Sequence, residues 1–208
     1  MSKTVLLLGF GQFLSYNYNP SGSIAKKLNG KSIKGFKIIG KVLPVEHIST
    51  STFAEKYITE THPSIILGLG LSAMRGSISI ERVALNRFYF TSENKTIDEP
   101  LSKKGKPAYF STIPVDSIKS KIERAGIPAE YSFWPDTFVS NELFYTIMKI
   151  AHKIKAKYAG FIHLPLTHEQ VIEKKWMHYG IRANVPSLTE KEETEAIKIA
   201  LEVCIQNL

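Results

Sequence analysis

The sequence predicts an α/β fold: one three-layer α/β/α sandwich whose central sheet is mixed and largely parallel. Three observations lead to this prediction. Short apolar runs of strand length alternate with longer segments of helical periodicity, which is the pattern of a sheet covered by helices. With 208 residues, the chain is long enough for one well-filled domain, 1–208, and short for two. The sequence contains no internal repeat and no linker.

The N-terminal part of the chain is expected to hold three strands and two helices. A glycine or a proline follows each apolar run and ends it. The first helix starts behind Asn19-Pro20, a pair suited to capping a helix. The expected strands are 4–8, 37–43 and 64–69, and the expected helices are 21–28 and 52–61.

The rest of the chain continues this alternation after one irregular stretch. Residues 88–108 are polar and lack periodicity, so we expect a long loop there. The segment around Glu81 is apolar and is interpreted as helical. The expected helices are 115–125, 141–154 and 187–208, and the expected strands are 129–133 and 160–164.

The composition is that of an ordinary globular protein, with 43% hydrophobic and 22% charged residues. The formal net charge is +8, but the lysines are spread along the chain, so we expect a solvated surface and no nucleic acid partner. The apolar runs are too short to cross a membrane, so no membrane partner is expected, and no signal peptide pattern is seen. Abundant lysine and isoleucine with a single cysteine fit a heat-adapted organism.

The cysteine count and the first glycine-containing turn limit the possible cofactors and location. Cys204 is the single cysteine, which excludes an intramolecular disulfide and a multi-cysteine metal site, and its apolar helical neighbours predict a packing role. We therefore expect a cytoplasmic location. The two-glycine turn at 9–11 follows a strand, as in dinucleotide-binding folds. However, Leu14 replaces the third glycine, and Pro44 stands where an acidic residue would bind a ribose, so no nucleotide site is expected.

Three groups of motifs follow one another along the chain, and the second is the most specific. It comprises Gly70-Leu71, Arg75 and the run ISIERVALN at 78–86. The first comprises Gly9-Phe10, Phe13 and Asn19-Pro20-Ser21, and the third comprises 126–132, Ser140-Asn141 and 160–165. In this order and at these separations, they resemble the motifs of the pyroglutamyl peptidases (pyrrolidone carboxyl peptidases), a thiol protease family, over nearly the whole chain.

This resemblance implies a fold, an activity and an assembly. Family members are single α/β/α sandwiches, usually homotetramers, that remove an N-terminal pyroglutamyl residue from peptides. They use a Cys-His-Glu triad and neither a metal nor a cofactor. Matched position by position, Glu81 corresponds to the acid of the triad and His163 to its general base, while Phe10 and Phe13 correspond to aromatic residues that enclose the lactam ring. The resemblance thus implies peptides with N-terminal pyroglutamate as substrates and a homo-oligomer, either a tetramer or a dimer.

Ser140 stands where the family keeps its cysteine nucleophile. A serine hydroxyl has no accessible anionic form comparable to a thiolate and must lose its proton to His163 during attack. If the triad is intact, Ser140 Oγ should lie within hydrogen-bonding reach of one His163 ring nitrogen, with Glu81 near the other. The N-terminal amides of the helix that follows Ser140 could then stabilise an oxyanion.

The surroundings of Ser140 also depart from the family's motifs. Gly11-Gln12 replaces Glu-Pro, Leu14-Ser15 replaces Gly-Gly, and Pro135-Asp136 replaces the Ala-Gly that precedes the nucleophile. Two hypotheses therefore stay open. The chain is a hydrolase of the pyroglutamyl peptidase type, or it is a catalytically silent homologue that binds peptide ends or a protein partner.

Each of the matched residues also has a purely structural explanation. The two phenylalanines are equally expected as core aromatics beneath the first loop. Glu81 could be a buried partner of a nearby arginine, either Arg75 or Arg82. His163 lies between apolar neighbours on an expected strand, and such a histidine is by itself more often part of the core than a catalyst.

Overall fold

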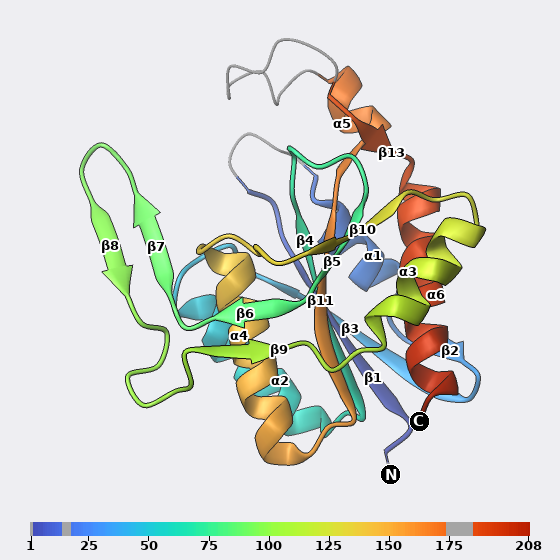
Figure 1. Ribbon diagram of the computed structural model, residues 1–208, viewed down its shortest axis with the longest axis horizontal. Coiled ribbons are helices and arrows are strands. Elements are labelled where there is room, and N and C mark those ends of the chain that lie inside the picture. Colours follow the sequence, from blue (N-terminus) through green and yellow to red (C-terminus); the bar gives the residue numbers. More distant parts are fainter. Residues whose placement is uncertain (1, 14–17, 174–184) are drawn as a thin grey trace.

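A seven-stranded mixed sheet forms the middle layer of the molecule (Figure 1). The computed structural model describes residues 2–13, 18–173 and 185–208. In spatial order the strands are β10 (Ala129–Ser132), β5 (Ile78–Glu81), β11 (Tyr158–Leu164), β4 (Ile65–Leu71), β1 (Thr4–Phe10), β3 (Phe36–Leu43) and β2 (Ser32–Ile33). The strands β11, β4, β1 and β3 are parallel, and so are β10 and β5, whereas β5 is antiparallel to β11 and β2 to β3. The predicted mixed, largely parallel sheet is confirmed.

The central strands are buried on both faces, which explains why they appear in the sequence as continuous apolar runs. On β1, Val5 and Leu7 enter one core cluster, while Leu6 and Leu8 enter the cluster on the opposite face. All four side chains are fully buried. The strands β1, β4 and β11 were therefore predictable from the sequence, apart from their ends.

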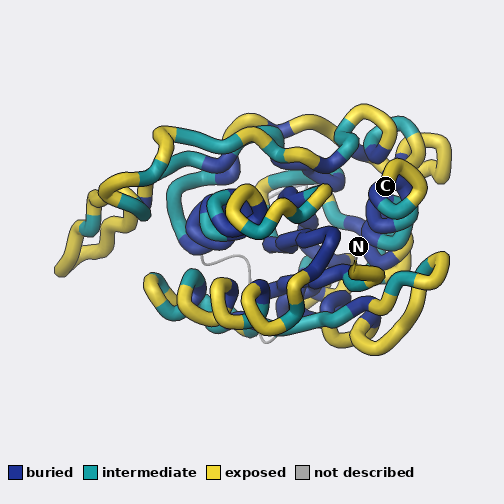
Figure 2. The backbone as a smooth tube through the Cα atoms, turned by 90° about the horizontal axis from the view of Figure 1, so that it is seen from below, coloured by how far each residue is buried: buried dark blue, intermediate teal, exposed yellow. Residues whose placement is uncertain are grey.

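Helices form the two outer layers (Figure 1). They are α1 (Pro20–Leu28), α2 (Ser49–Thr61), α3 (Val115–Arg124), α4 (Val139–Ile154) and α6 (Glu190–Gln206), whereas the short α5 (His168–Ile172) lies beyond one end of the sheet (Figure 1). The helices α1, α3 and α6 pack on one face of the sheet, and α2 and α4 pack on the other. Figure 2 shows that buried backbone is concentrated between these layers, with the exposed backbone outside. In the described part of the chain, no helix has the length and apolar character needed to span a membrane.

Residues 88–108, predicted as a loop, contain regular structure instead. The strands β7 (Phe88–Thr91) and β8 (Thr96–Glu99) form an antiparallel hairpin that extends away from the sheet (Figure 1). Further along, β9 (Ala108–Phe110) pairs with β6 (Val83–Leu85). The prediction missed the hairpin because its short strands are mostly exposed and therefore lack a hydrophobic period.

The segment around Glu81 and the start of the last helix also differ from the prediction. Glu81 ends strand β5 and does not lie in a helix; β5 has four residues, Ile-Ser-Ile-Glu, all buried, and so short a run does not distinguish a strand from a helix. The helix α6 begins after Thr189, which forms a capping box with Glu192. The two residues at which the helix was expected to start form β13 (Ser187–Leu188), which pairs with β12 (Leu166–Thr167).

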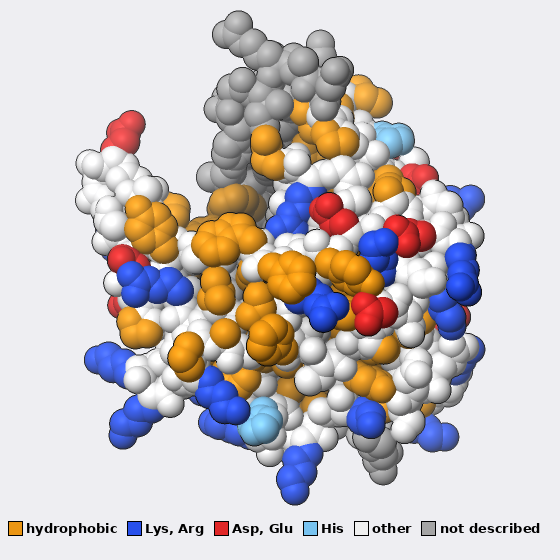
Figure 3. Space-filling view, in the orientation of Figure 1, with side chains coloured by type: hydrophobic (Ala, Val, Ile, Leu, Met, Phe, Trp, Pro, Cys, Tyr) orange, Lys and Arg blue, Asp and Glu red, His pale blue; other side chains and the backbone are white. Residues whose placement is uncertain are grey.

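Apolar side chains gather on the face shown in Figure 3, around β9 and the segment between β10 and α4. Phe110, Tyr131, Phe133 and Trp134 are exposed in these segments. The guanidinium of Arg82 lies over the rings of Tyr131 and Phe133. We call the four aromatic residues the aromatic patch.

Candidate active site

A buried histidine and a buried glutamate meet on the face of the sheet that packs against α4. In the antiparallel register of β11 and β5, Phe161 pairs with Glu81 and His163 pairs with Ser79. Side chains two residues apart on a strand share a face, so His163 lies on the same face as Phe161. Glu81, the register partner of Phe161, also lies on that face, diagonally opposite His163. Phe161 belongs to the core cluster that contains α4. Glu81 Oε1 and His163 Nδ1 are 2.7 Å apart, and both side chains are buried.

A positive charge balances the carboxylate of this pair. Arg75 Nη1 donates to Glu81 Oε1 at 2.7 Å, and Arg75 Nη2 donates to the carbonyl of Trp134 at 2.7 Å. Burial by itself raises the pKa of Glu81, but the hydrogen bond and charge of His163, with Ser132 and Arg75, outweigh it and lower this pKa. The ionised carboxylate holds the histidine proton on Nδ1, which leaves Nε2 as an acceptor. Of the two arginines considered from the sequence, Arg75 is thus the partner of the buried Glu81, and its own side chain is partly exposed.

Ser140 lies in the first turn of α4, next to the histidine. A Cβ on Gly70 of β4 would stand 2.9 Å from Ser140 Oγ and 3.0 Å from His163 Cδ2, so the two side chains meet over a strand position that has none. Among the described residues, the buried Nε2 of His163 has no hydrogen-bond partner. The expected Ser140–His163 hydrogen bond is therefore not formed, whereas Glu81 is at the other ring nitrogen as expected. Catalytic hydrogen bonds are often longer before substrate binds.

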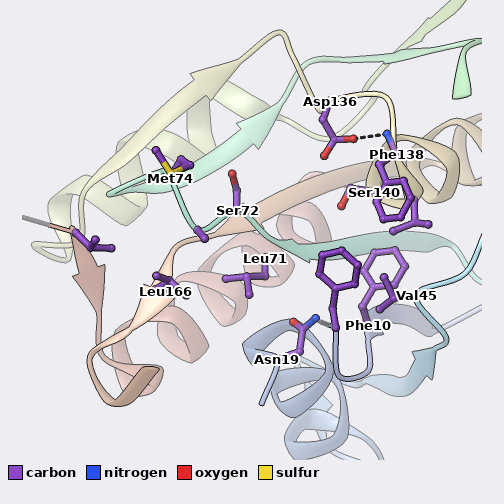
Figure 4. A pocket seen from close by; sticks show the side chains of 14 residues that line it. Phe10, Asn19, Val45, Leu71, Ser72, Met74, Asp136, Phe138, Ser140 and Leu166 are labelled. Atoms are coloured by element: carbon purple, nitrogen blue, oxygen red, sulfur yellow. Dashed lines mark hydrogen bonds between the residues drawn. The ribbon is translucent and has the colours of Figure 1, made fainter. Parts of the chain in front are cut away.

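A pocket of about 430 Å³ opens beside Ser140 (Figure 4). Phe10 and Phe13, both singled out in the sequence, line it, and Phe10 is also part of the core. The ring centroids of Phe13 and Phe138 are 5.8 Å apart. Sequence reasoning missed most of the lining, which comes from the ends of strands and helices and from the segments beside them. These residues are Asn19, Val45, Leu71, Ser72, Ala73, Met74, Phe138, Val139, Leu166 and Val185.

The loop between β1 and α1 forms one wall of the pocket and is fixed by Asn19. Its Oδ1 accepts from the backbone N–H of Ser21 at 3.1 Å, which caps α1, and its Nδ2 donates to the carbonyl of Gly11 at 2.9 Å. The loop is long, unlike the tight strand-to-helix turn of a dinucleotide-binding fold. Leu14 and Ser15, which entered the sequence argument, lie outside the described residues.

Asp136, noted in the sequence only as a departure from the family's motif, also lines the pocket. Its backbone is left-handed, with a φ of 63°. One oxygen, Oδ1, accepts from the backbone N–H of Phe138 at 2.6 Å. Burial raises the pKa of Asp136, against the lowering effects of His163 and of the Phe138 hydrogen bond.

Known proteins are similar to this chain in both sequence and fold. The family model described as pyroglutamyl peptidase matches residues 3–207. The chain belongs to the pyroglutamyl peptidase family. Among curated relatives of this family member, the pyrrolidone-carboxylate peptidases of Bacillus cytotoxicus and Pyrococcus furiosus are each 36% identical to it over 98% of its length. The match covers 94% of the first relative and 99% of the second.

Solved structures of pyroglutamyl peptidases have the same fold as this chain. One is a mutant pyrrolidone carboxyl peptidase from the hyperthermophile Pyrococcus furiosus, with a TM-score of 0.91 at 36% identity. The similarity covers 99% of both chains. The α/β fold predicted from the sequence is therefore that of the family. The family includes a relative from a hyperthermophile, which agrees with the heat adaptation expected from the lysine- and isoleucine-rich composition.

Proposed function

We propose that this pyroglutamyl peptidase family member is a cytoplasmic hydrolase that removes N-terminal pyroglutamate from peptides. Ser140 is the nucleophile, His163 the general base, and Glu81 the residue that orients the base. The proposal rests chiefly on the buried Glu81–His163 pair, whose Nε2 has no partner among the described residues and lies near Ser140 beside the pocket. A single, buried, unpaired Cys204 is compatible with a reducing compartment.

The proposed reaction has an acylation step and a hydrolysis step. Ser140 Oγ attacks the pyroglutamyl carbonyl carbon and its proton passes to His163 Nε2, which then gives that proton to the leaving amine as the amide C–N bond breaks. Water next attacks the acyl-serine carbonyl and passes a proton to His163. The C–O bond to serine breaks, pyroglutamate leaves, and Ser140 recovers the proton. Glu81 stabilises the imidazolium formed in each step.

The pocket and the start of α4 support the two other requirements of this reaction. A pyroglutamyl ring is uncharged, and the aromatic walls formed by Phe10, Phe13 and Phe138 suit such a ring. The first amides of a helix lack partners within the helix, and Ser140 lies in the first turn of α4. These amides supply N–H donors near the carbonyl oxygen that becomes negatively charged.

Turnover of a fluorogenic pyroglutamyl amide tests the proposal. We expect kcat to fall by at least about a thousandfold in Ser140→Ala and by a similar factor in His163→Ala, because the two groups act as one unit. Ser140→Cys supplies the thiolate nucleophile of the family and should be active. If neither the protein nor Ser140→Cys turns the amide over while circular dichroism shows an intact fold, the proposal is wrong.

One observation favours the second candidate function, a catalytically silent binding protein. Ser140 and His163 are not hydrogen-bonded, so the nucleophile is not yet poised for proton transfer. Calorimetry with pyroglutamyl peptides and with free pyroglutamate separates the two functions. Tight binding without turnover supports the binding protein, and efficient turnover excludes it.

A further inference from the structure

Asp136 brings a carboxylate oxygen into the pocket beside the proposed nucleophile. Its Oδ1 is held by the backbone N–H of Phe138, while the second oxygen points toward the space between Ser72 and Ser140 (Figure 4). Among the described residues, no hydrogen bond is made by this second oxygen. The family's motif has glycine at this position, so a neutral lactam does not require the carboxylate.

Apart from Asp136, the described side chains that line the pocket are uncharged and mostly apolar. Of the described lining residues, Asp136 is the only one that ionises. The charged groups behind it are His163, Glu81 and Arg75, and the last two already pair with each other. A carboxylate in such surroundings lacks a cation on the pocket side, and a bound ligand can provide it.

Two other polar side chains of the pocket differ in what they offer a lactam: the Ser72 hydroxyl is a donor, whereas Asn19 is engaged. Asn19 already donates to the carbonyl of Gly11 and accepts from Ser21, so its amide is engaged. Asp136 is an acceptor when ionised and repels a carbonyl oxygen. The carboxylate nearest the nucleophile therefore offers an acceptor to a five-membered ring that carries an N–H donor.

We propose that the pocket also accepts an N-terminal proline, with its protonated ring nitrogen paired to Asp136. Proline has the same five-membered ring as pyroglutamate, attached in the same way to the scissile carbonyl, but it lacks the lactam carbonyl. At a peptide's N-terminus, its ring nitrogen is a cation with two N–H donors. This nitrogen lies one carbon away from the carbonyl that Ser140 attacks, and Ser140 and Asp136 line the same pocket (Figure 4). The rings of Phe10, Phe13 and Phe138 add cation–π attraction.

This substrate extension rests on the proposed function of Ser140, His163 and Glu81. The same bonds form and break: an ester forms at Ser140, the amide C–N bond breaks, and water releases free proline. His163 takes and returns the same protons as before. Asp136 neither gives nor takes a proton in these steps. It acts on substrate binding by holding the charged ring nitrogen.

Hydrolysis of three fluorogenic amides, pyroglutamyl, prolyl and alanyl, tests the proposal. We expect turnover of the prolyl amide in addition to the pyroglutamyl amide, and little turnover of the alanyl amide, which has a cation but no ring. Asp136→Asn should lower kcat/KM for the prolyl amide by about tenfold or more, the effect of losing one charge-assisted hydrogen bond. The same change should lower kcat/KM for the pyroglutamyl amide by a smaller factor, since a neutral donor gains less from a charged acceptor.

Asp136→Asn is a conservative variant for this test. Asparagine tolerates the left-handed backbone at this position, and its side-chain oxygen can still accept from Phe138. Asp116→Asn removes a carboxylate of the same size from a largely exposed site and serves as the matched control. The control should leave both activities unchanged.

Each result decides one of the two proposals. Turnover of the pyroglutamyl amide without the prolyl amide overturns the proline extension and leaves the proposed function standing. Equal losses on both amides in Asp136→Asn also overturn it, because the residue would then only shape the loop. If neither the protein nor Ser140→Cys hydrolyses any of the amides, the proposed function fails, and calorimetry with L-prolinamide and L-pyroglutamamide decides the rest. Prolinamide binding that Asp136→Asn abolishes supports the pocket assignment, and any other binding result overturns it.

Discussion

The approach of Ser140 to His163 is set by a residue without a side chain. Beside the two distances given above, Phe161 Cζ lies 2.9 Å from the position that a Cβ on Gly70 would take. A Cβ on Gly68, two residues earlier on the same face of β4, would stand even closer to the ring of Phe161. A closely packed interior cannot absorb an added methyl group at such distances without moving its neighbours. The bare face of β4 is thus what allows α4 and β11 to present their side chains to each other.

Substitution of Gly70 by alanine should separate Ser140 from His163. We expect the free energy of unfolding to fall by about 1–3 kcal/mol and the kcat for a pyroglutamyl amide to fall by at least about tenfold. Urea unfolding and initial rates measure the two effects. Gly11→Ala is the control, since its Cβ would be 3.6 Å from the nearest atom, the carbonyl oxygen of Leu43. Equal effects of both substitutions would show that the Gly70 contact does not matter.

Glu81→Gln should remove activity while keeping the size of the side chain. The amide can donate to His163 Nδ1, which moves the histidine proton to Nε2 and leaves no acceptor for the serine proton. We expect kcat to fall by about 10⁴-fold, measured with the pyroglutamyl amide after the fold has been checked by circular dichroism. Glu130→Gln, which changes an exposed carboxylate on β10, is the control. A loss of less than about tenfold in Glu81→Gln would contradict the assigned role.

Among the elements, α6 carries an unusual buried acid. Glu193 lies near the start of α6 and is fully buried. Among the described residues, neither of its carboxylate oxygens has a hydrogen-bond partner. Burial, with the negative charges of Glu190, Glu169 and Glu192, raises the pKa of Glu193 to about 9. The side chain is therefore protonated in the folded protein at neutral pH and ionised in the unfolded chain.

This acid should make stability fall as pH rises. The folded-state pKa of Glu193 lies above the unfolded-state value of 4.5. Its stabilising contribution to the free energy of unfolding is therefore complete below about pH 4.5 and is lost progressively up to about pH 9. The slope approaches about 1.4 kcal/mol per pH unit within that window. Urea unfolding at pH 5 and pH 7 should show this slope in the protein and in the exposed control Glu195→Gln, and a flatter dependence in Glu193→Gln. An unchanged slope in Glu193→Gln would mean that Glu193 is already ionised in the folded state.

The elements that the sequence predicted well are those whose burial leaves a strong pattern. The helix at 141–154 and the strand at 160–164 were placed to within two residues at each end, because α4 is amphipathic and β11 is a continuous apolar run. The strand β5 was mistaken for a helix because its four residues are too few to distinguish the two periods. The hairpin of β7 and β8 was missed because its short strands are mostly exposed and carry no hydrophobic period.

The candidate site was predictable only in part, for a physical reason. Glu81, His163 and Ser140 could be named because the resemblance covers their motifs, but their proximity depends on strand register and on Gly70. The role of Asp136 could not be read from the sequence, because it depends on which way a loop turns its side chain. The catalytic roles themselves stay predictions until turnover is measured.

At the scale of the whole molecule, the exposed aromatic residues indicate an interface with another chain. The aromatic patch lies on one face, and Tyr89 and Phe90 are exposed on the hairpin that extends away from the sheet (Figures 1 and 3). Phe88, the third of these adjacent aromatics, is instead buried and stacks on His47. Contiguous apolar surface of this kind often marks an interface.

We expect the protein to form a homo-oligomer, a dimer or a tetramer. Light scattering at micromolar concentration should give two or four times the 23.4 kDa of one chain. The net charge of +8 opposes association only weakly at physiological salt, where screening acts over about 8 Å. Changing Phe133 and Trp134 together to serine should reduce the mass if the aromatic patch is the interface. A mass of one chain that does not change on concentration would contradict the expectation.

The residues that would break the peptide bond and the residues that would choose the peptide lie on different kinds of segment. Glu81, His163 and Ser140 stand on β5, β11 and α4, whereas Phe13, Val45, Asp136 and Val185 stand on segments between such elements. Segments between strands accept substitution more readily than buried strands do. This separation makes the chain evolvable: a mutational library confined to these segments can search for new substrates without disturbing the chemistry. The exchange of a single loop residue for an aspartate is the kind of step by which one lineage could acquire a second substrate.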